Sequence, residues 1–487
     1  MKRYLQKLYK SSRSKSPAKS SKTMAENSIA SGTQAQVLTK ESGEAFVEAL
    51  RRNSTLSVLE AKYVVFPTQY PDIPPIIAHA SSLSPPLEIA VKCGGAHSST
   101  WASSAGGLVI DLGKLNKVTV SSDKKTVTVQ GGARWGDVYS ACQEASIDVV
   151  GGPFWFVGVG GYLTGGGYSP FTPQYGMAID NIIDATVVLA NGNIVKTSPT
   201  EEPDLFWAIR GGGNQFGIVV EFTLKAIPYS GPYTMGAIGY AGSEIDNVIK
   251  VVQEWKTTYT PKEKLNITYN RPGPHFKPSI TVLPWVSEDK DDRSKEVLAP
   301  FRALNPAVDT CKAVRDMLAV SHGADAMMKV APPKLIIRGT LITDLYPDMM
   351  LDVWQKWVAF TEENPDARAT SILWELSGAD RIADVASDAT AFHARDPHFW
   401  VAIQGRSISE SSEAVMRSFV AKTANEIRQF NTRKAGKDAG FFLNFAQGDE
   451  TLEEVHGPNL PKLKKLKAKY DPKGLWRKGI YIEPDFN

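Results

Sequence analysis

Short apolar runs separated by polar turns in the first half of the chain predict an alternation of strands and helices. Tyr63–Phe66, Leu87–Val91 and Leu108–Leu112 are almost continuously apolar, which is typical of buried strands. Apolar residues at helical spacing predict helices over 43–60 and Ile73–Ala80. The same reasoning predicts strands at Val118–Ser121, Thr126–Gln130, Ile183–Leu189, Ile194–Thr197 and Ile218–Leu224, and helices at Trp135–Glu144 and Pro203–Ala208.

After Pro228 the pattern changes to longer strands and longer helices with few glycine clusters, which predicts a second, α+β domain over 229–440. Its strands are expected at Leu265–Tyr269, Ser279–Leu283, Lys334–Arg338, Ala369–Leu376 and Phe399–Ile403, and its helices at Val248–Thr257, Pro347–Phe360 and Ser411–Gln429. The first domain is assigned to 41–228, and a C-terminal segment to 441–487.

Composition and charge are those of a soluble globular protein, with 42% hydrophobic and 22% charged residues in 487. Residues 1–23 carry eight Lys and Arg and no acid, so residues 1–40 are expected to be a disordered, basic, Ser-rich tail. The rest of the chain is net acidic, which argues against nucleic-acid binding. No apolar stretch is long enough to span a membrane.

The N-terminal segment has no apolar core of a secretory signal, which predicts a cytoplasmic or otherwise intracellular protein. A mitochondrial transit peptide is the less favoured alternative. The three cysteines Cys93, Cys142 and Cys311 are widely spaced and odd in number, so we expect reduced thiols and no metal site.

Glycine is concentrated in three turns of the first half, at 94–95, 158–167 and 211–217. Residues 158–167 contain six glycines, which allow backbone to approach a large or phosphorylated ligand closely. The spacing does not fit the Gly-x-Gly-x-x-Gly dinucleotide pattern, and the sequence has no P-loop. The glycine turns therefore predict a cradle for a ligand of another class.

Seven motifs in fixed order match a known family. They are Val91-Lys-Cys-Gly-Gly-Ala-His97, Gly107–Leu112, Thr126–Gly136, Val157–Gly167, Tyr175–Asn181, Asp204–Gly213 and Tyr470-Asp-Pro472. Their order over 60–228 and 440–484 resembles the FAD-linked oxidases, and more narrowly the berberine-bridge-enzyme-like branch of the vanillyl-alcohol-oxidase fold. The resemblance implies an α+β fold with a two-subdomain, PCMH-type FAD-binding domain and a substrate-binding domain whose antiparallel sheet is flanked by helices.

The resemblance also implies which residues hold FAD. Two backbone turns would wrap the pyrophosphate, and residues near Asp180 and 211–219 would contact the adenosine end or the flavin edge. The cofactor residues implied in this way are Lys92, Cys93, Gly94, Gly95, Ala96, His97, Ser98, Val157, Gly158, Gly160, Gly161, Gly165, Gly166, Asp180, Gly213, Gly217, Val219 and Asn444.

The chain departs from the family pattern where relatives bond covalently to the flavin. Ala96 stands at the position of the flavin-linked histidine, and a histidine follows one residue later, at His97. Either His97 carries a single covalent link or the link is absent. Phe154 occupies the place of a second, cysteinyl link and excludes it, while Val157 matches a position that favours access of oxygen.

A second departure concerns the catalytic base, because the family's Tyr-x-Asn motif reads Phe442-Leu-Asn444 here. Phenylalanine has no proton to exchange, whereas oxidation of an O–H or N–H group needs a base. The remaining candidates for a catalytic residue are His393, Glu375 and Tyr162, each with an ordinary packing or pairing role as the alternative.

We therefore expect an FAD-dependent oxidase that transfers hydride from an alcohol, an amine or an activated C–H group to flavin N5 and then to O2. Aromatic residues at Trp101 and 154–156 favour a small apolar metabolite as substrate. A carbohydrate or oligosaccharide oxidase is one alternative, and a flavin-binding protein without redox turnover is another. The expected partners are the small substrate and O2, in a monomer or homodimer.

Overall fold

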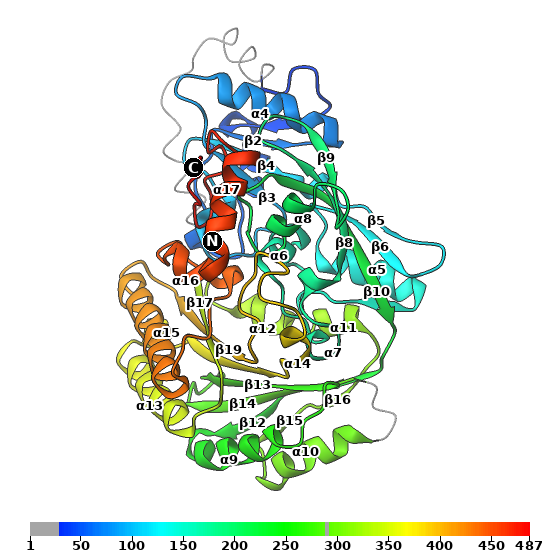
Figure 1. Ribbon diagram of the computed structural model, residues 1–487. Helices are drawn as coiled ribbons and strands as arrows, with labels where there is room; N and C mark the ends of the chain where they lie inside the picture. The colour runs from blue at the N-terminus through cyan, green and yellow to red at the C-terminus, as the bar shows by residue number, and fades with distance from the viewer. Residues whose placement is uncertain (1–28, 288–291) are drawn as a thin grey trace.

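The computed structural model describes residues 29–287 and 292–487, and its first layer is a four-stranded sheet with the order β1-β2-β4-β3 (Figure 1). β2 (Tyr63–Phe66), β4 (Leu108–Asp111) and β3 (Ile89–Lys92) pair in parallel, whereas β1 (Gln36–Leu38) pairs antiparallel with β2. Helix α4 (Ile73–Ser82) supplies the crossover between β2 and β3 that parallel strands require.

Part of the expected tail is ordered, so its predicted end at residue 40 is wrong. Residues 36–38 form β1, and the Ile29 side chain is buried in the core of this first sheet. Apolar positions are few in this segment and most of its residues are polar. A three-residue edge strand is too short to show the alternation from which a strand is predicted. Residues 1–28 of the expected tail lie outside the described residues.

A second sheet completes the first domain with the strand order β5-β6-β10-β8-β9, and β7 pairs with the far end of β10. The predicted hairpins and helices are confirmed here. The elements are β5 (Val118–Val120), β6 (Thr126–Gln130), α5 (Trp135–Ala145), β7 (Ile147–Val149), α6 (Val159–Gly165), α7 (Thr172–Tyr175), β8 (Ile182–Val188), β9 (Ile194–Thr197), α8 (Pro203–Ile209) and β10 (Ile218–Pro228).

The remaining domain is built on a nine-stranded antiparallel sheet, in agreement with the expected fold class. Its strands are β11 (Tyr233–Met235), β12 (Ile238–Ala241), β13 (Glu263–Asn270), β14 (Ser279–Val286), β15 (Val308–Asp309), β16 (Lys312–Val314), β17 (Lys334–Ile342), β18 (Ser371–Ser377) and β19 (Phe399–Ser407). Its helices are α9 (Ile245–Lys256), α10 (Arg293–Ala303), α11 (Met317–Ser321), α12 (Asp325–Val330), α13 (Pro347–Glu363), α14 (Asp380–Ala383) and α15 (Glu413–Ala435).

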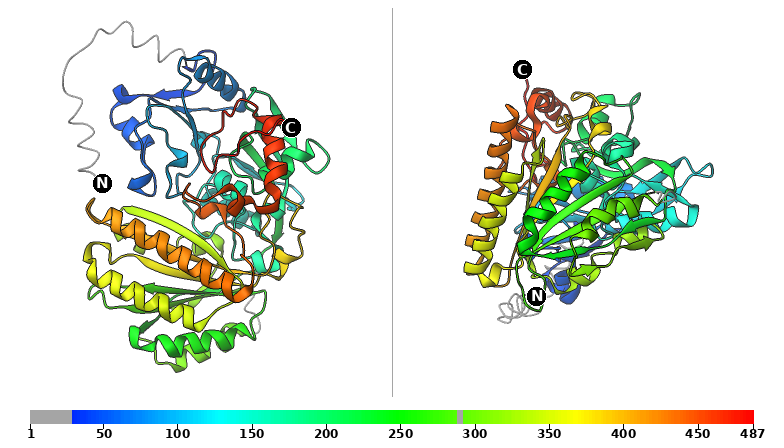
Figure 2. Two further views of the ribbon diagram at one scale, coloured as in Figure 1. Left: turned by 60° about the vertical axis from the view of Figure 1, so that its left-hand side comes forward. Right: turned by 90° about the horizontal axis from the view of Figure 1, so that it is seen from below.

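The two faces of this sheet have different neighbours (Figure 2). Helices α9, α13 and α15 cover one face, where alternate residues such as Ile267 and Trp374 are buried in a separate apolar core. The other face carries Trp400 and Leu341, which belong to the large apolar core of the first domain. Because side chains alternate along a strand, Glu375 points to this second face, away from Trp374 and Leu376.

The C-terminal segment returns to the first domain through α16 (Leu452–His456) and α17 (Leu460–Tyr470), which packs on α8. Its Tyr-Asp-Pro motif is explained by a fully buried ion pair between Lys467 and Asp471, 2.7 Å apart. The Lys467 ammonium also donates to the carbonyls of Gln215 and Trp476. This network anchors the end of the chain next to the third glycine turn.

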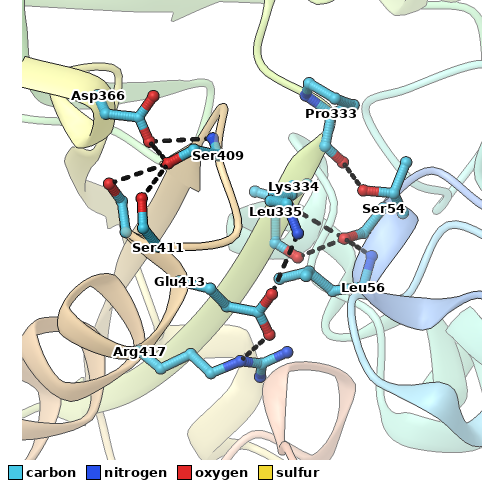
Figure 3. A network of polar contacts seen from close by, with 12 residues as sticks. Ser54, Leu56, Pro333, Lys334, Leu335, Asp366, Ser409, Ser411, Glu413 and Arg417 are labelled. Atoms are coloured by element: carbon cyan, nitrogen blue, oxygen red, sulfur yellow. Dashed lines mark hydrogen bonds and ion pairs between the residues drawn. The ribbon is translucent and has the colours of Figure 1, made fainter. Parts of the chain in front are cut away.

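Ser54 joins the two domains at a second place (Figure 3). Its hydroxyl donates to the Leu335 carbonyl of β17 at 2.6 Å and accepts the Leu335 N–H at 3.0 Å. The same hydroxyl accepts the Leu56 N–H and so begins a short 3-10 helix, Thr55–Ser57. The segment 54–57 is thereby held against the nine-stranded sheet.

The long helix expected over 43–60 is wrong, because two short elements form there instead, α3 (Glu44–Ala49) and the 3-10 helix Thr55–Ser57. The Ser54 contacts with β17 draw the following residues into the domain junction, which local periodicity does not reveal. Among the residues that the structure describes, no helix has both the length and the apolarity to cross a membrane.

Candidate functional site

The first two glycine turns touch each other directly. A Cβ on Gly94 would lie 2.4 Å from the Gly158 nitrogen, and one on Gly158 would lie 2.4 Å from the Cys93 Sγ. A Cβ on Gly160 would approach the carbonyl of Gly131 to 3.0 Å. Glycine is therefore required at these positions for backbone packing between the two turns.

Gly161, in contrast, faces open space. The residue is exposed, and a Cβ on Gly161 would meet no atom within 4 Å. The Asn444 amide donates to the carbonyls of Gly161 and Tyr162, at 3.1 and 3.2 Å. Gly165 leaves the room that the Asn444 side chain fills, since a Cβ would lie 2.6 Å from its Oδ1. The glycine run and the C-terminal segment thus meet at this opening.

His97 lies beside the Asn444 backbone and is held in one orientation. Its ring stacks on Trp101 with centroids 4.7 Å apart, and its Nδ1 accepts the Ser99 N–H at 3.0 Å. Burial lowers the pKa of His97 to about 4, so the imidazole is neutral near pH 7.

Two buried polar atoms at this place have no hydrogen-bond partner, His97 Nε2 and Asn444 Oδ1. Unpartnered buried polar atoms are costly unless a ligand satisfies them. Together with the open side of Gly161, they fit a cofactor that presents hydrogen-bonding groups between the glycine run and the loop 92–98. These residues are therefore suited to hold FAD.

Several other expected cofactor residues are engaged in protein contacts. Lys92 forms a buried ion pair with Asp111 at 2.8 Å, and the Cys93 thiol donates to the Ala133 carbonyl at 3.3 Å. The Asp180 carboxylate pairs with Arg395. Gly95 adopts positive φ against Arg52, and Ser98 accepts the N–H of Ile337. Ala96 is half-buried between these contacts.

The remaining expected residues border the same region from the side of the glycine run. Val157 is half-buried and its carbonyl accepts the Trp135 N–H. Gly166 has positive φ beside Phe442. The Gly213 N–H donates to Thr164, next to the run. Gly217 and Val219 lie farther along the chain, where β10 begins to pair with β8.

The three candidate catalytic residues have different surroundings. The Tyr162 hydroxyl donates to the Tyr168 carbonyl at 2.5 Å, and burial with the nearby Glu375 charge raises the pKa of Tyr162 far above its usual value. Glu375 forms a buried ion pair with Lys264 at 2.7 Å. His393 lies against Gly440 and Gly457 of the C-terminal segment. The structure thus brings Tyr162 and Glu375 together and places His393 in a separate contact.

A pair that no sequence motif indicated, Tyr168 and His398, lies beside them. The Tyr168 hydroxyl is hydrogen-bonded to His398 Nε2, and His398 Nδ1 donates to the Asp396 carbonyl at 2.6 Å. The Tyr168 ring makes an edge contact with Phe442, with centroids 4.6 Å apart. A phenol and an imidazole therefore border the position where Phe442 replaces a tyrosine.

Comparisons with known proteins agree on one family. A family profile described as FAD binding domain matches residues 61–198, and one described as Berberine and berberine like matches residues 441–479. The FAD-linked oxidoreductase pgmH of Aspergillus terreus is 30% identical over 470 residues, covering 91% of this chain and 92% of its own length.

Two solved structures share the fold. Physcomitrella patens BBE-like 1 superposes with a TM-score of 0.80 at 19% identity, covering 94% of this chain and 99% of its own. Glucooligosaccharide oxidase from Acremonium strictum superposes with a TM-score of 0.77 at 21% identity, covering 93% and 97%. The second structure is described as having a 6-S-cysteinyl, 8α-N1-histidyl FAD.

Proposed function

The chain belongs to the FAD-linked oxidoreductases of the berberine-bridge-enzyme-like family, and on that premise we propose that it is an oxidase of small, largely apolar organic metabolites. FAD, when bound, accepts hydride from the substrate and passes the electrons to O2. The substrate is an alcohol, an amine or a molecule with an activated C–H group.

The aromatic lining of the sheet face that meets the glycine run carries the substrate part of this proposal. Trp400 stacks on Phe445 with centroids 4.9 Å apart, and Phe442 lies between Phe445 and Tyr168. Leu373, on the same face of the sheet, is also half-buried against this cluster. Such a surface favours a flat apolar molecule over a fully hydroxylated one.

Glu375 is the residue that we assign as proton acceptor. It lies on the sheet face opposite its apolar strand neighbours, and its charge acts on both Tyr162 and Tyr168. Lys264 holds the carboxylate in place from the neighbouring strand. The Tyr162 hydroxyl donates its hydrogen bond to a backbone carbonyl, so Tyr162 positions the glycine run, and Asn444 fixes the same backbone from the other side.

A second candidate function is oligosaccharide oxidation, the activity named for the glucooligosaccharide oxidase that shares this fold. Asn266 stands directly opposite Glu375 on the neighbouring strand, with a buried Oδ1 that has no partner, and Gln404 lies half-buried on the same face. These amides are groups that bind sugar hydroxyls. They are fewer than the aromatic residues of the lining, which is why the apolar substrate is preferred.

Reduction of the flavin by candidate substrates, and its reoxidation by air with release of hydrogen peroxide, tests the proposal and separates it from its alternatives. The purified protein is expected to be yellow, and its flavin is expected to bleach anaerobically with benzylic, terpenoid or polyphenolic alcohols and to recover its colour in air. Faster turnover of cellobiose or xylobiose than of any aromatic alcohol would establish the second function instead. A yellow protein that neither panel reduces would be a flavin-binding protein without redox turnover.

A further inference from the structure

The loop that carries Ala96 and His97 is clamped along its backbone. The Gly95 carbonyl accepts the Asn53 N–H at 3.0 Å, and the His97 carbonyl accepts the Ser57 hydroxyl at 3.2 Å. The Ser98 hydroxyl accepts the Ile337 N–H of β17 and an N–H of the Gln447 side chain. Moving His97 by one residue into the place of Ala96 would break these bonds together.

Asn53, whose N–H holds the Gly95 carbonyl, is followed by Ser54, and Ser54 is itself hydrogen-bonded to β17 (Figure 3), which makes such a slip still more costly. The histidine therefore stays one position away from the family's attachment point. Ala96, at that point, has only a methyl group and no nucleophile.

Neither ring nitrogen of His97 has a free lone pair with which to form a covalent bond to the flavin. Neutral imidazole has one nitrogen with a proton and one with a free lone pair, and a hydrogen bond at one nitrogen determines the state of the other. Here Nδ1 accepts the Ser99 N–H and also contacts the Ser99 hydroxyl at 2.7 Å. Its lone pair is thus occupied, and Nε2 carries the proton.

The other nucleophiles near the glycine run are also engaged. The Cys93 thiol donates to Ala133, and burial raises the pKa of Cys93 to about 11, so the reactive thiolate is scarce. The Tyr162 hydroxyl is bonded to the Tyr168 carbonyl. Phe154 stands where relatives carry the cysteine of a second link.

We propose that this chain holds FAD without any covalent bond and that His97 donates its Nε2 proton to the bound cofactor. The inference rests on the proposed function, since it presupposes that FAD is the cofactor. Of the two alternatives left open by the sequence, it selects the absence of a link and excludes a single link through His97. The His97 ring lies beside the Asn444 backbone. Its buried Nε2 makes no hydrogen bond of normal geometry there and is the atom that the cofactor would satisfy.

Denaturation of the full-length protein tests the absence of a covalent bond. After precipitation with trichloroacetic acid, all flavin absorbance is expected in the supernatant, and the polypeptide is expected to have its unmodified mass. A yellow pellet, or a mass increased by one FAD less its displaced hydrogens, would overturn the inference while leaving the flavoenzyme assignment intact. A protein that contains no flavin and binds none from solution would overturn both.

Two substitutions test the hydrogen bond by FAD titration of the apoprotein. His97→Leu removes the donor and is expected to raise the Kd for FAD roughly two- to tenfold, the loss of one hydrogen bond. His97→Gln keeps a terminal N–H and is expected to restore most of the affinity. Wild-type affinity in His97→Leu would overturn the donor role.

A third measurement does not depend on how the variants fold. In wild-type protein labelled with 15N at histidine, the His97 side chain is expected to carry its proton at Nε2, whereas a proton at Nδ1 would overturn the inference.

Discussion

Asp180 and Arg395, 215 positions apart, form a bidentate ion pair in which the two guanidinium nitrogens donate to the two carboxylate oxygens at 2.8 and 2.9 Å. Both side chains are almost fully buried. The same guanidinium also donates to Thr390 Oγ1 and to the Phe392 carbonyl. A residue expected at the cofactor therefore ties the FAD-binding half to the loop that precedes β19.

Breaking this pair should cost much more than breaking an exposed one. Asp180→Asn leaves the Arg395 charge buried without a counter-ion and is expected to destabilise the fold by about 3–5 kcal/mol. The double substitution Asp180→Leu with Arg395→Met removes both charges and is expected to recover most of that loss. Urea unfolding of the apoprotein measures the free energy of unfolding of the wild type and of both variants.

The matched control is Arg381→Ala, which removes the exposed ion pair with Asp384. It is expected to cost at most about 1 kcal/mol. An Asp180→Asn variant no less stable than this control would show that the buried pair does not hold the two domains.

The second prediction concerns Glu375. Glu375→Gln removes the proton acceptor that we assign and is expected to lower kcat by about 100-fold or more on the substrate found by screening. FAD content should stay unchanged, because Glu375 bonds to Lys264 and to none of the residues that border the cofactor opening.

Loss of activity through unfolding must be separated from loss of a base. Glu375→Gln leaves the buried Lys264 ammonium without its partner, so we expect lower stability as well. Lys264→Met combined with Glu375→Gln is expected to restore stability but not kcat. If the double variant regained activity, Glu375 would be a structural residue and the base would lie elsewhere, with Tyr168 as the next group to substitute.

Local sequence patterns supplied the candidate cofactor residues but did not reveal the residue pairs on the neighbouring sheet, for a physical reason. The glycine turns, Phe154 and Asn444 stand in short motifs whose spacing is set by backbone packing. The Lys264–Glu375 and Tyr168–His398 pairs instead depend on the register between strands and on the packing of two domains. Lys264 and Glu375 are 111 positions apart, so no local pattern reports that they meet.

A third prediction follows from buried histidines. Burial lowers the pKa of His398 to about 4 and that of His456 to about 3, and the His456 ring has no partner at either nitrogen. In the unfolded chain a histidine titrates near pH 6.5. Between about pH 6.5 and 4 the unfolded state therefore binds more protons, and the free energy of unfolding must fall as the pH falls.

Each such histidine contributes up to about 1.4 kcal/mol per pH unit to this slope. His456→Leu removes one of these buried histidines together with its two unsatisfied ring nitrogens. We therefore expect the free energy of unfolding to depend less steeply on pH and to be higher at pH 5. Urea unfolding at pH 7, 6 and 5 gives the slopes, with His275→Leu at an exposed position as the control. Parallel slopes for wild type and His456→Leu would contradict the assignment.

The last prediction separates a glycine needed for folding from one needed for the cofactor. A methyl group at Gly158 would overlap the Gly94 nitrogen at 2.3 Å and the Cys93 Sγ at 2.4 Å, so the two turns would be forced apart. Gly158→Ala is expected to destabilise the apoprotein by several kcal/mol, about the cost of an overpacked core. Its Kd for FAD should rise as a consequence.

Gly161→Ala is the matched opposite, because a methyl group there meets no protein atom within 4 Å. The residue lies within α6, where alanine is favoured over glycine by about 1 kcal/mol, so the apoprotein should be as stable as wild type or more stable. FAD affinity should nevertheless fall, since the cofactor is what the new methyl group would meet. Thermal unfolding of the apoprotein and FAD titration separate the two effects, and unchanged FAD affinity in Gly161→Ala would place the cofactor away from this opening.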